Sequence, residues 1–191
     1  SDNGAVPIMP PRKQYLNGSN TPLSRGKWDA FEGGIRVPFI ISGPKIKAGV
    51  ESKVAISFSD LLPSIIDIAG NKTPQYDYLD GGSFKKVAFK NGKGKVKRNN
   101  DGIVIHVPYE NRIALKRAHA SIIIDNFKLI KFYDNYDLML FDLENDFQEK
   151  NNLAEVMIEK TKTFELLLES YLTKVRAPKW KPGINWKSES I

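Results

Sequence analysis

Residues 121–143 contain the pattern that most constrains how this chain can fold. Three short apolar segments follow one another here: 121–124, 127–133 and 137–143. The breaks between them are Asp125-Asn126 and Asp134-Asn135, and both pairs favour tight turns between strands. Because strands joined by such short turns pair with their neighbours along the chain, the segment predicts an antiparallel meander.

A helix is expected directly after these strands, over residues 155–175. Its apolar side chains recur at helical spacing: Phe164, Leu167, Leu168, Tyr171, Leu172 and Val175. An apolar stripe of this kind packs on one face of a sheet. A further short strand is predicted at 103–105, and the tail at 177–191 is expected to lack regular structure.

The first 70 residues carry different signals. The run at 37–42 is apolar and ends at Gly43-Pro44, which predicts a buried strand of a parallel or mixed sheet. Ser59-Asp60 then begins a predicted helix that continues to Ala69 and stops at Gly70. We expect one face of this helix to be buried, because its apolar residues keep helical spacing: Leu61, Leu62, Ile65, Ile66 and Ala69.

A basic segment at 85–98 separates these regions and contributes to the formal net charge of +7. Its lysines alternate with glycine and asparagine, so we interpret it as a mobile connection or a loose hairpin. Two roles stay open, namely recognition of an anionic polymer and a simple solvated loop. Aromatic residues near it are restricted to Phe84 and Phe89, which disfavours binding of single-stranded nucleic acid.

Composition excludes several classes of site. The chain has no cysteine, so disulfides, zinc–thiolate sites and a cysteine nucleophile are excluded within it. No apolar run is long enough to span a bilayer. The first residues lack the basic start and apolar centre of a signal peptide.

Asp2, Asn3 and Lys27 are the candidate site residues. Asp2 and Asn3 place a carboxylate and an amide carbonyl side by side before Gly4, and calcium takes oxygen ligands of this kind. Asp-Asn-Gly is also an ordinary turn sequence. The ammonium of Lys27 can stabilise charge on a sulfate or phosphate oxygen, although Lys27 is also one of many lysines in the chain.

The segment 32–38, with the sequence Glu-Gly-Gly-Ile-Arg-Val-Pro, is more specific. Adjacent glycines permit unusual backbone conformations or a close approach by another segment. Glu32 and Arg36 flank the glycines, and a bidentate pair between them would fix the turn. We expect both to shape the loop rather than touch a substrate. The two histidines, His106 and His119, receive no role, because lone histidines are more often structural.

Four parts of the chain resemble, in order and approximate spacing, the C-terminal half of the formylglycine-dependent sulfatases. They are residues 1–4; 25–38; 59–70 followed by 79–81; and 127–130 followed by 140–146 and 151–154. The resemblance is most specific in the 32–38 segment and in the Asp-Leu-Leu-Pro start of the helix at residue 60. It extends over most of the chain.

The resemblance implies an α/β fold: the C-terminal part of an alkaline-phosphatase-like sulfatase, with a small antiparallel sheet subdomain under a C-terminal helix. Residues 1–70 would end the large domain, 71–100 would form a basic connection, and 101–191 would hold the sheet, helix and tail. It implies hydrolysis of sulfate esters on a sulfated small molecule or polysaccharide, in the periplasm or outside the cell. No nucleic acid partner and no membrane span are expected.

The resemblance also implies that Asp2 and Asn3 are two calcium ligands and that Lys27 is a catalytic residue that contacts the sulfate. The family's nucleophile, a formylglycine made from Cys or Ser in a Cys/Ser-x-Pro-x-Arg motif, has no counterpart in this sequence. We therefore expect a sulfatase that is inactive as this chain alone and depends on a missing N-terminal half.

Two alternatives remain. One is a non-catalytic module that binds anionic glycans through the basic run Lys85–Arg98 and the tryptophans of the tail. The other is a phosphoester or phosphonate hydrolase of the same superfamily, which shares the metal-binding turn.

Overall fold

The computed structural model describes residues 1–6, 20–72, 79–100, 102–110 and 117–182. The chain divides into two compact units, one made of Ser1–Pro38 with Val104–Ile191 and the other of Phe39–Ile103. The division therefore falls at different positions from the expected boundaries at residues 70 and 100. Residues 1–38 group with the C-terminal sheet.

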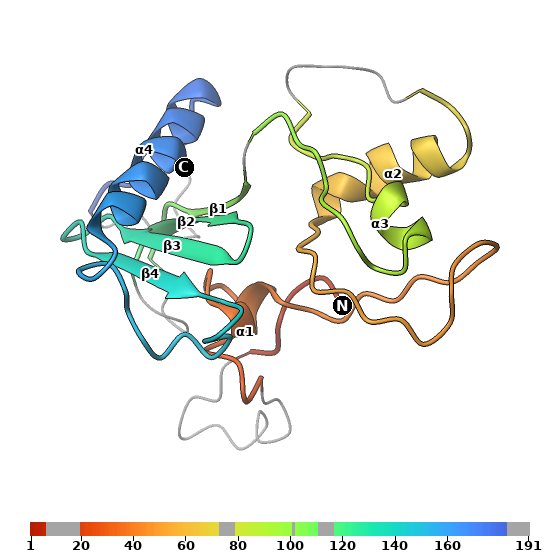
Figure 1. Ribbon diagram of the computed structural model, residues 1–191. Helices are drawn as coiled ribbons and strands as arrows, with labels where there is room; N and C mark the ends of the chain where they lie inside the picture. The colour runs from red at the N-terminus through yellow and green to blue at the C-terminus, as the bar shows by residue number, and fades with distance from the viewer. Residues whose placement is uncertain (7–19, 73–78, 101, 111–116, 183–191) are drawn as a thin grey trace. The chain divides into compact units, whose positions relative to one another are not determined.

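The first unit is built on a four-stranded sheet (Figure 1). Its strands are β1 (Ile103–Val107), β2 (His119–Ile124), β3 (Phe127–Phe132) and β4 (Leu138–Asp142), in that spatial order. The pairs β2–β3 and β3–β4 are antiparallel. The predicted meander is therefore confirmed, and its turns fall at the expected Asp-Asn pairs.

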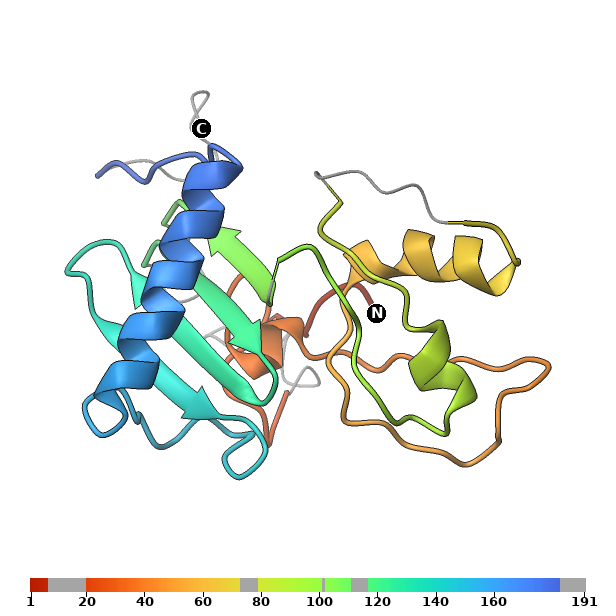
Figure 2. The ribbon, with the colours of Figure 1, turned by 45° about the horizontal axis from the view of Figure 1, so that its top comes forward.

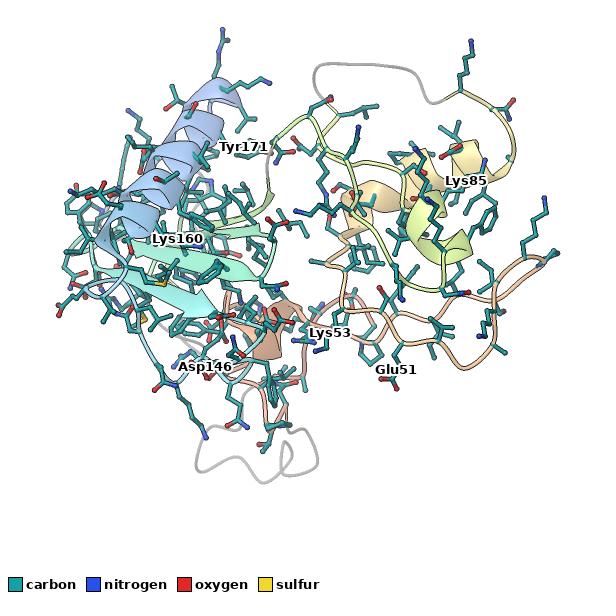
Figure 3. All side chains as sticks on the ribbon, in the orientation of Figure 1. Glu51, Lys53, Lys85, Asp146, Lys160 and Tyr171 are labelled. Atoms are coloured by element: carbon teal, nitrogen blue, oxygen red, sulfur yellow. The ribbon has the colours of Figure 1, made fainter. Side chains whose placement is uncertain are left out.

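Helix α4 (Ile158–Lys174) lies across one face of this sheet, as the sequence predicted (Figures 1 and 2). Buried side chains from the sheet and the helix form the core there: Ala120, Ile122, Leu129, Leu140, Phe164 and Leu168. Polar contacts add to this packing, because Lys131 pairs with Glu165 at 2.7 Å and with Glu169 at 2.9 Å. Lys160, labelled in Figure 3, lies 3.6 Å from the centre of the Phe127 ring.

The opposite face of the sheet is also covered, which the sequence did not predict. Residues of β3 alternate between the two faces, so Lys128, Ile130 and Phe132 point away from α4. Phe31 packs against Ile130, Phe132 and Phe141 on this second face. Phe31 directly precedes α1 (Glu32–Ile35), the single helical turn that contains the paired glycines.

The second unit contains the turn η2 (Phe58–Asp60) and helices α2 (Leu61–Ile68) and α3 (Lys85–Phe89). The fully buried Asp60 connects them: it accepts hydrogen bonds from the backbone of Ser57 and Gly82 and forms an ion pair with Arg98 at 2.6 Å. Lys85, visible in Figure 3, pairs with Asp67 of α2 at 3.0 Å. The basic segment thus begins with a short helix, where the sequence predicted a loose connection, and continues through residues 90–98 without helix or strand to the anchored Arg98.

Two further predictions for this unit are wrong. Residues 37–42 do not form a strand, and Phe39, Ile40 and Ile41 are 47%, 89% and 37% exposed. An extended segment becomes a strand only when another strand pairs with it, and the described residues supply none here.

Helix α2 forms where predicted, but its apolar face is not buried. Leu62 and Ile65 are 61% and 62% exposed, whereas the buried residues of the helix are Pro63 and Ser64. The pattern therefore predicted the helix correctly, but the predicted burial of its apolar face is wrong. Among the helices in the described ranges, none combines the length and apolar character needed to cross a bilayer.

Candidate functional site

The two segments that carry the predicted site residues lie against each other. The backbone N–H of Gly4 donates to Gly34 at 2.9 Å, and the N–H of Lys27 donates to the carbonyl of Ala5 at 3.0 Å. Asn20 reinforces this contact, because its side chain both accepts from and donates to the backbone of Ala5, at 2.8 and 2.9 Å. Backbone hydrogen bonds therefore hold the segment that contains Asp2 and Asn3 against the segment that contains Lys27.

Three glycines make this close approach possible. A Cβ on Gly4 would meet the carbonyl oxygen of Gly33 at 1.7 Å. A Cβ on Gly33 would meet the carbonyl of Ser24 at 2.3 Å, and one on Gly34 would meet that of Asp29 at 2.2 Å. The paired glycines thus serve close backbone contact rather than an unusual dihedral angle, which resolves the choice that the sequence left open.

Lys27 occupies a tight turn between Gly26 and Asp29. The N–H of Asp29 donates to the carbonyl of Gly26 at 3.1 Å, and Trp28 has a φ of 77°, as the third position of a type II turn requires. Arg25 pairs with Asp29 at 2.5 Å across the turn. The half-buried Lys27 ammonium lies 5.4 Å from the centre of the Trp28 ring.

Asp2 and Asn3 lie at the chain start beside this turn. The amide nitrogen of Asn3 donates to the Asp2 carboxylate at 2.6 Å, so the two side chains lie in contact, with the Asn3 nitrogen toward Asp2. Their donor chemistry fits calcium, which takes about six to eight oxygens, but the pair would supply two of them. Within the described ranges no group of three or more His, Cys, Asp or Glu residues could hold a metal ion.

A buried charge network lies under the glycine turn. The ammonium of Lys128, fully buried on β3, pairs with Glu32 at 2.7 Å and with Glu149 at 2.8 Å. Glu149 also accepts the backbone N–H of Glu32 at 2.7 Å. Burial raises the pKa of Glu149, and Lys128 opposes that change.

This network corrects the expected pairing of Glu32 with Arg36. Arg36 contacts Glu32 through a single contact of 3.2 Å, so the predicted bidentate pair does not form. Lys128 is the closer cation, at 2.7 Å. The expectation that Glu32 shapes the loop agrees with this geometry.

Lys128 and His119 together hold the residue that follows the Lys27 turn. Ala30 is fully buried; its N–H donates to Nε2 of His119 at 3.0 Å, and its carbonyl accepts from Lys128 at 3.0 Å. Nδ1 of His119 lies 2.8 Å from the carbonyl of Arg117. Burial lowers the pKa of His119.

Sequence reasoning assigned no site role to Lys128, Glu149 or His119. Lys128 sits in a strand beside Lys131, where a lysine normally faces solvent. His106, the other histidine, is half-buried on β1 near the Tyr133 ring, and burial lowers its pKa. Only the alternation of β3 offered a signal, because it places Lys128 on the face away from α4.

Comparison with known families decides what this arrangement belongs to. Residues 26–177 match the family model described as N-sulphoglucosamine sulphohydrolase, C-terminal. The chain belongs to this sulfatase family. It is 28% identical over 187 residues to human arylsulfatase K, and that match covers 86% of this chain and 33% of the relative. The sulfatase chain therefore spans about a third of the length of this relative.

Other relatives give the same picture. Over 82 residues the chain is 42% identical to N-acetylgalactosamine-6-sulfatase of Rattus norvegicus, covering 42% of this chain and 15% of the relative. A solved structure of Ps i-CgsB with k-i-k-neocarrahexaose matches with a TM-score of 0.70 and 26% identity, covering 94% of this chain and 37% of that one.

A second solved structure, BT4656 in complex with its substrate D-glucosamine-2-N,6-O-disulfate, matches with a TM-score of 0.59 and 28% identity. The match covers 82% of this chain and 31% of that one. The fold is that of the alkaline-phosphatase-like sulfatases.

Proposed function

We propose that this chain is the C-terminal portion of a sulfuric ester hydrolase that cleaves sulfate esters on sugars. The observation that carries the proposal is the contact between the two segments with candidate site residues. The backbone N–H of Lys27 donates to the carbonyl of Ala5, which follows Asp2 by three residues. The named substrates and functions of the relatives, which include a disulfated glucosamine, support a sulfated saccharide as the substrate class.

In this proposal Lys27 binds and orients the sulfate group. A lysine ammonium is a compact charge that neutralises an anionic oxygen without a fixed direction of approach. The turn around Lys27 limits where that charge can lie, because Asp29, which follows Lys27, is bonded to Gly26 and Arg25, which precede it. A pre-positioned charge stabilises a transition state more than a mobile one, since less reorganisation accompanies the reaction.

Asp2 and Asn3 would hold part of a calcium ion's coordination shell. A bound divalent cation at this place would withdraw charge from sulfate oxygens. The remaining oxygen ligands and the nucleophile would come from polypeptide outside this chain. We propose on this ground that the chain alone hydrolyses no sulfate ester. From the family resemblance we also propose that the complete enzyme acts in the periplasm or outside the cell.

Hydrolysis by the complete polypeptide that carries this chain tests the proposal. An aryl sulfate, an N- and O-sulfated glucosamine and the matching phosphate monoester would be compared at equal concentration, with and without added calcium. We expect turnover of the sulfate esters and little of the phosphate. Preferential phosphate hydrolysis would favour the phosphoester hydrolase. Turnover by this chain alone would contradict the proposal that the nucleophile and the remaining metal ligands lie outside it.

A second candidate function, binding of anionic glycans, is supported by one observation. Five lysines of the basic segment are exposed between its anchored ends: Lys86, Lys90, Lys93, Lys95 and Lys97. The anchors are the ion pairs of Lys85 with Asp67 and of Arg98 with Asp60. Affinity for a sulfated polysaccharide that falls steeply with salt, and survives loss of Lys27, would favour this function.

A further inference from the structure

A histidine of the C-terminal sheet forms a hydrogen bond with the loop that carries Lys27. Nε2 of His119 accepts the N–H of Ala30 at 3.0 Å, three residues after Lys27. An imidazole nitrogen accepts a hydrogen bond only when it carries no proton. Nδ1, which lies 2.8 Å from the carbonyl of Arg117, must then carry the proton and donate it. The two contacts together define one neutral tautomer.

We propose that His119 is a positioning residue for Lys27, which holds the Lys27 turn in place only while its imidazole is neutral. The inference rests on the proposed function, because it assigns a supporting residue to that same site. It needs no contact between His119 and the substrate. The histidine acts through Ala30, whose carbonyl is held from the neighbouring strand by Lys128 at 3.0 Å.

Protonation would break this support at a defined atom. A second proton would go to Nε2, and its N–H would then face the N–H of Ala30, so two donors would meet in a buried site. His119 is 1% exposed and Ala30 is fully buried, so water cannot readily replace the lost acceptor. The Lys27 turn would lose one of the two bonds that hold Ala30.

The charged groups around His119 come from the neighbouring elements. Asp29 of the Lys27 turn favours the protonated form, whereas the charges of Arg25 in the same loop and of Arg117, two residues before His119, oppose it. His106 of β1 also faces this region, since His119 contributes to the lowering of its pKa. The Phe132 ring of β3 lies 5.9 Å from the imidazole and adds no charge.

Two conservative variants separate the two ring nitrogens. A glutamine side chain reaches as far as Nε2, so in His119→Gln its carbonyl can accept the Ala30 N–H at every pH. An asparagine reaches as far as Nδ1, so His119→Asn keeps only the bond to the Arg117 carbonyl. Both remove the titrating group: His119→Gln keeps only the bond to Ala30, on which the proposal depends, and His119→Asn keeps only the bond to Arg117. His106→Gln is the matched control for the other histidine.

The first readout is hydrogen exchange of the Ala30 amide, which does not depend on activity. After correction for intrinsic exchange, wild-type protein should lose protection at Ala30 as the pH falls through the folded-state pKa of His119, which burial holds below the ordinary histidine value of about 6.5. His106→Gln should behave in the same way. His119→Gln should keep its protection across this range, and His119→Asn should exchange about 10-fold faster or more at neutral pH.

The second readout is kcat and KM of the complete enzyme. We expect His119→Asn to lower kcat by about 10- to 100-fold and His119→Gln to retain most of it, since displacement of a catalytic group is costly. The inference is overturned if His119→Asn matches wild type in both Ala30 exchange and kcat. A changed exchange with an unchanged kcat in both His119→Asn and Lys27→Ala would instead contradict the proposed function.

Discussion

The two units of the molecule differ in how far their apolar side chains are buried. In the first unit the sheet is covered on both faces, by α4 on one and by the segment around Phe31 on the other. In the second unit the apolar residues Ile40, Leu62 and Ile65 are 89%, 61% and 62% exposed. The comparison shows that a local hydrophobic pattern specifies an element, but not what covers it.

The same comparison locates the candidate site. The Lys27 turn belongs to the first unit, where a buried network and a completed sheet support it. The second unit is organised internally by Asp60 and Arg98 but leaves an apolar surface on α2. We propose that further polypeptide completes the second unit, in line with the fraction of the relatives that this chain spans.

The largest expected effect is on the network below the glycine turn. Lys128→Met would leave Glu149 without its cation and Glu32 with only the longer contact to Arg36, and the side chains of Lys128 and Glu149 are both fully buried. We expect the free energy of unfolding to fall by about 3–5 kcal/mol, the cost of breaking a buried ion pair. Urea denaturation measures this. Lys162→Met, in an exposed pair on α4, should change it by less than about 0.5 kcal/mol.

A pair of leucines tests the contrast between the units directly. Leu168 of α4 is fully buried, whereas Leu62 of α2 is 61% exposed. Leu168→Ala should lower the free energy of unfolding by about 2–5 kcal/mol because it leaves a cavity. Leu62→Ala should cost less than about 0.5 kcal/mol in this chain. Equal losses at the two positions would show that α2 is covered after all.

A smaller effect is expected at the β3–β4 turn. Arg117 donates to Asp134 at 2.6 and 2.7 Å, and this hydrogen bonding holds the pKa of Asp134 below its ordinary value. The stabilisation is therefore present above the unfolded-state pKa, about 3.9, and is lost as the pH falls through the folded-state pKa. Asp134→Asn should cost less than about 1 kcal/mol at pH 7, since the pair is partly exposed.

Unfolding measured at pH 7 and again at pH 3 tests this sign. The difference between wild type and Asp134→Asn should shrink at the lower pH. A difference that stays constant with pH would mean that the ion pair contributes nothing. Glu159→Gln, on an 89% exposed side chain, provides the control.

The elements that the sequence predicted well are those whose partners are close in the chain. The meander follows from two Asp-Asn turns, and α4 begins soon after β4, so local pattern and tertiary contact agree. The burial of Leu62 and the strand at 37–42 were mispredicted because each depends on a partner that the pattern does not contain. Periodicity identifies an apolar face and leaves its covering open.

The site divides in the same way. Asp2, Asn3 and Lys27 were predicted as site residues because they lie in short motifs that resemble a known family, and their roles stay a prediction. Lys128, Glu149 and His119 were missed, because their roles arise from contacts across the fold, such as Lys128 with Ala30. A lysine within a strand carries no mark in the sequence that distinguishes a buried partner from a solvated one.

The most direct test of the central claim is the kcat of Lys27→Ala in the complete polypeptide, with a sulfated saccharide as substrate. Lys47→Ala, at an exposed lysine of the second unit outside the basic segment, is the matched control. We expect Lys27→Ala to lower kcat by about 100-fold or more, as loss of a charge-stabilising group does, while Lys47→Ala stays near wild type. An unchanged kcat in Lys27→Ala would contradict the assignment of Lys27 to the sulfate-binding site.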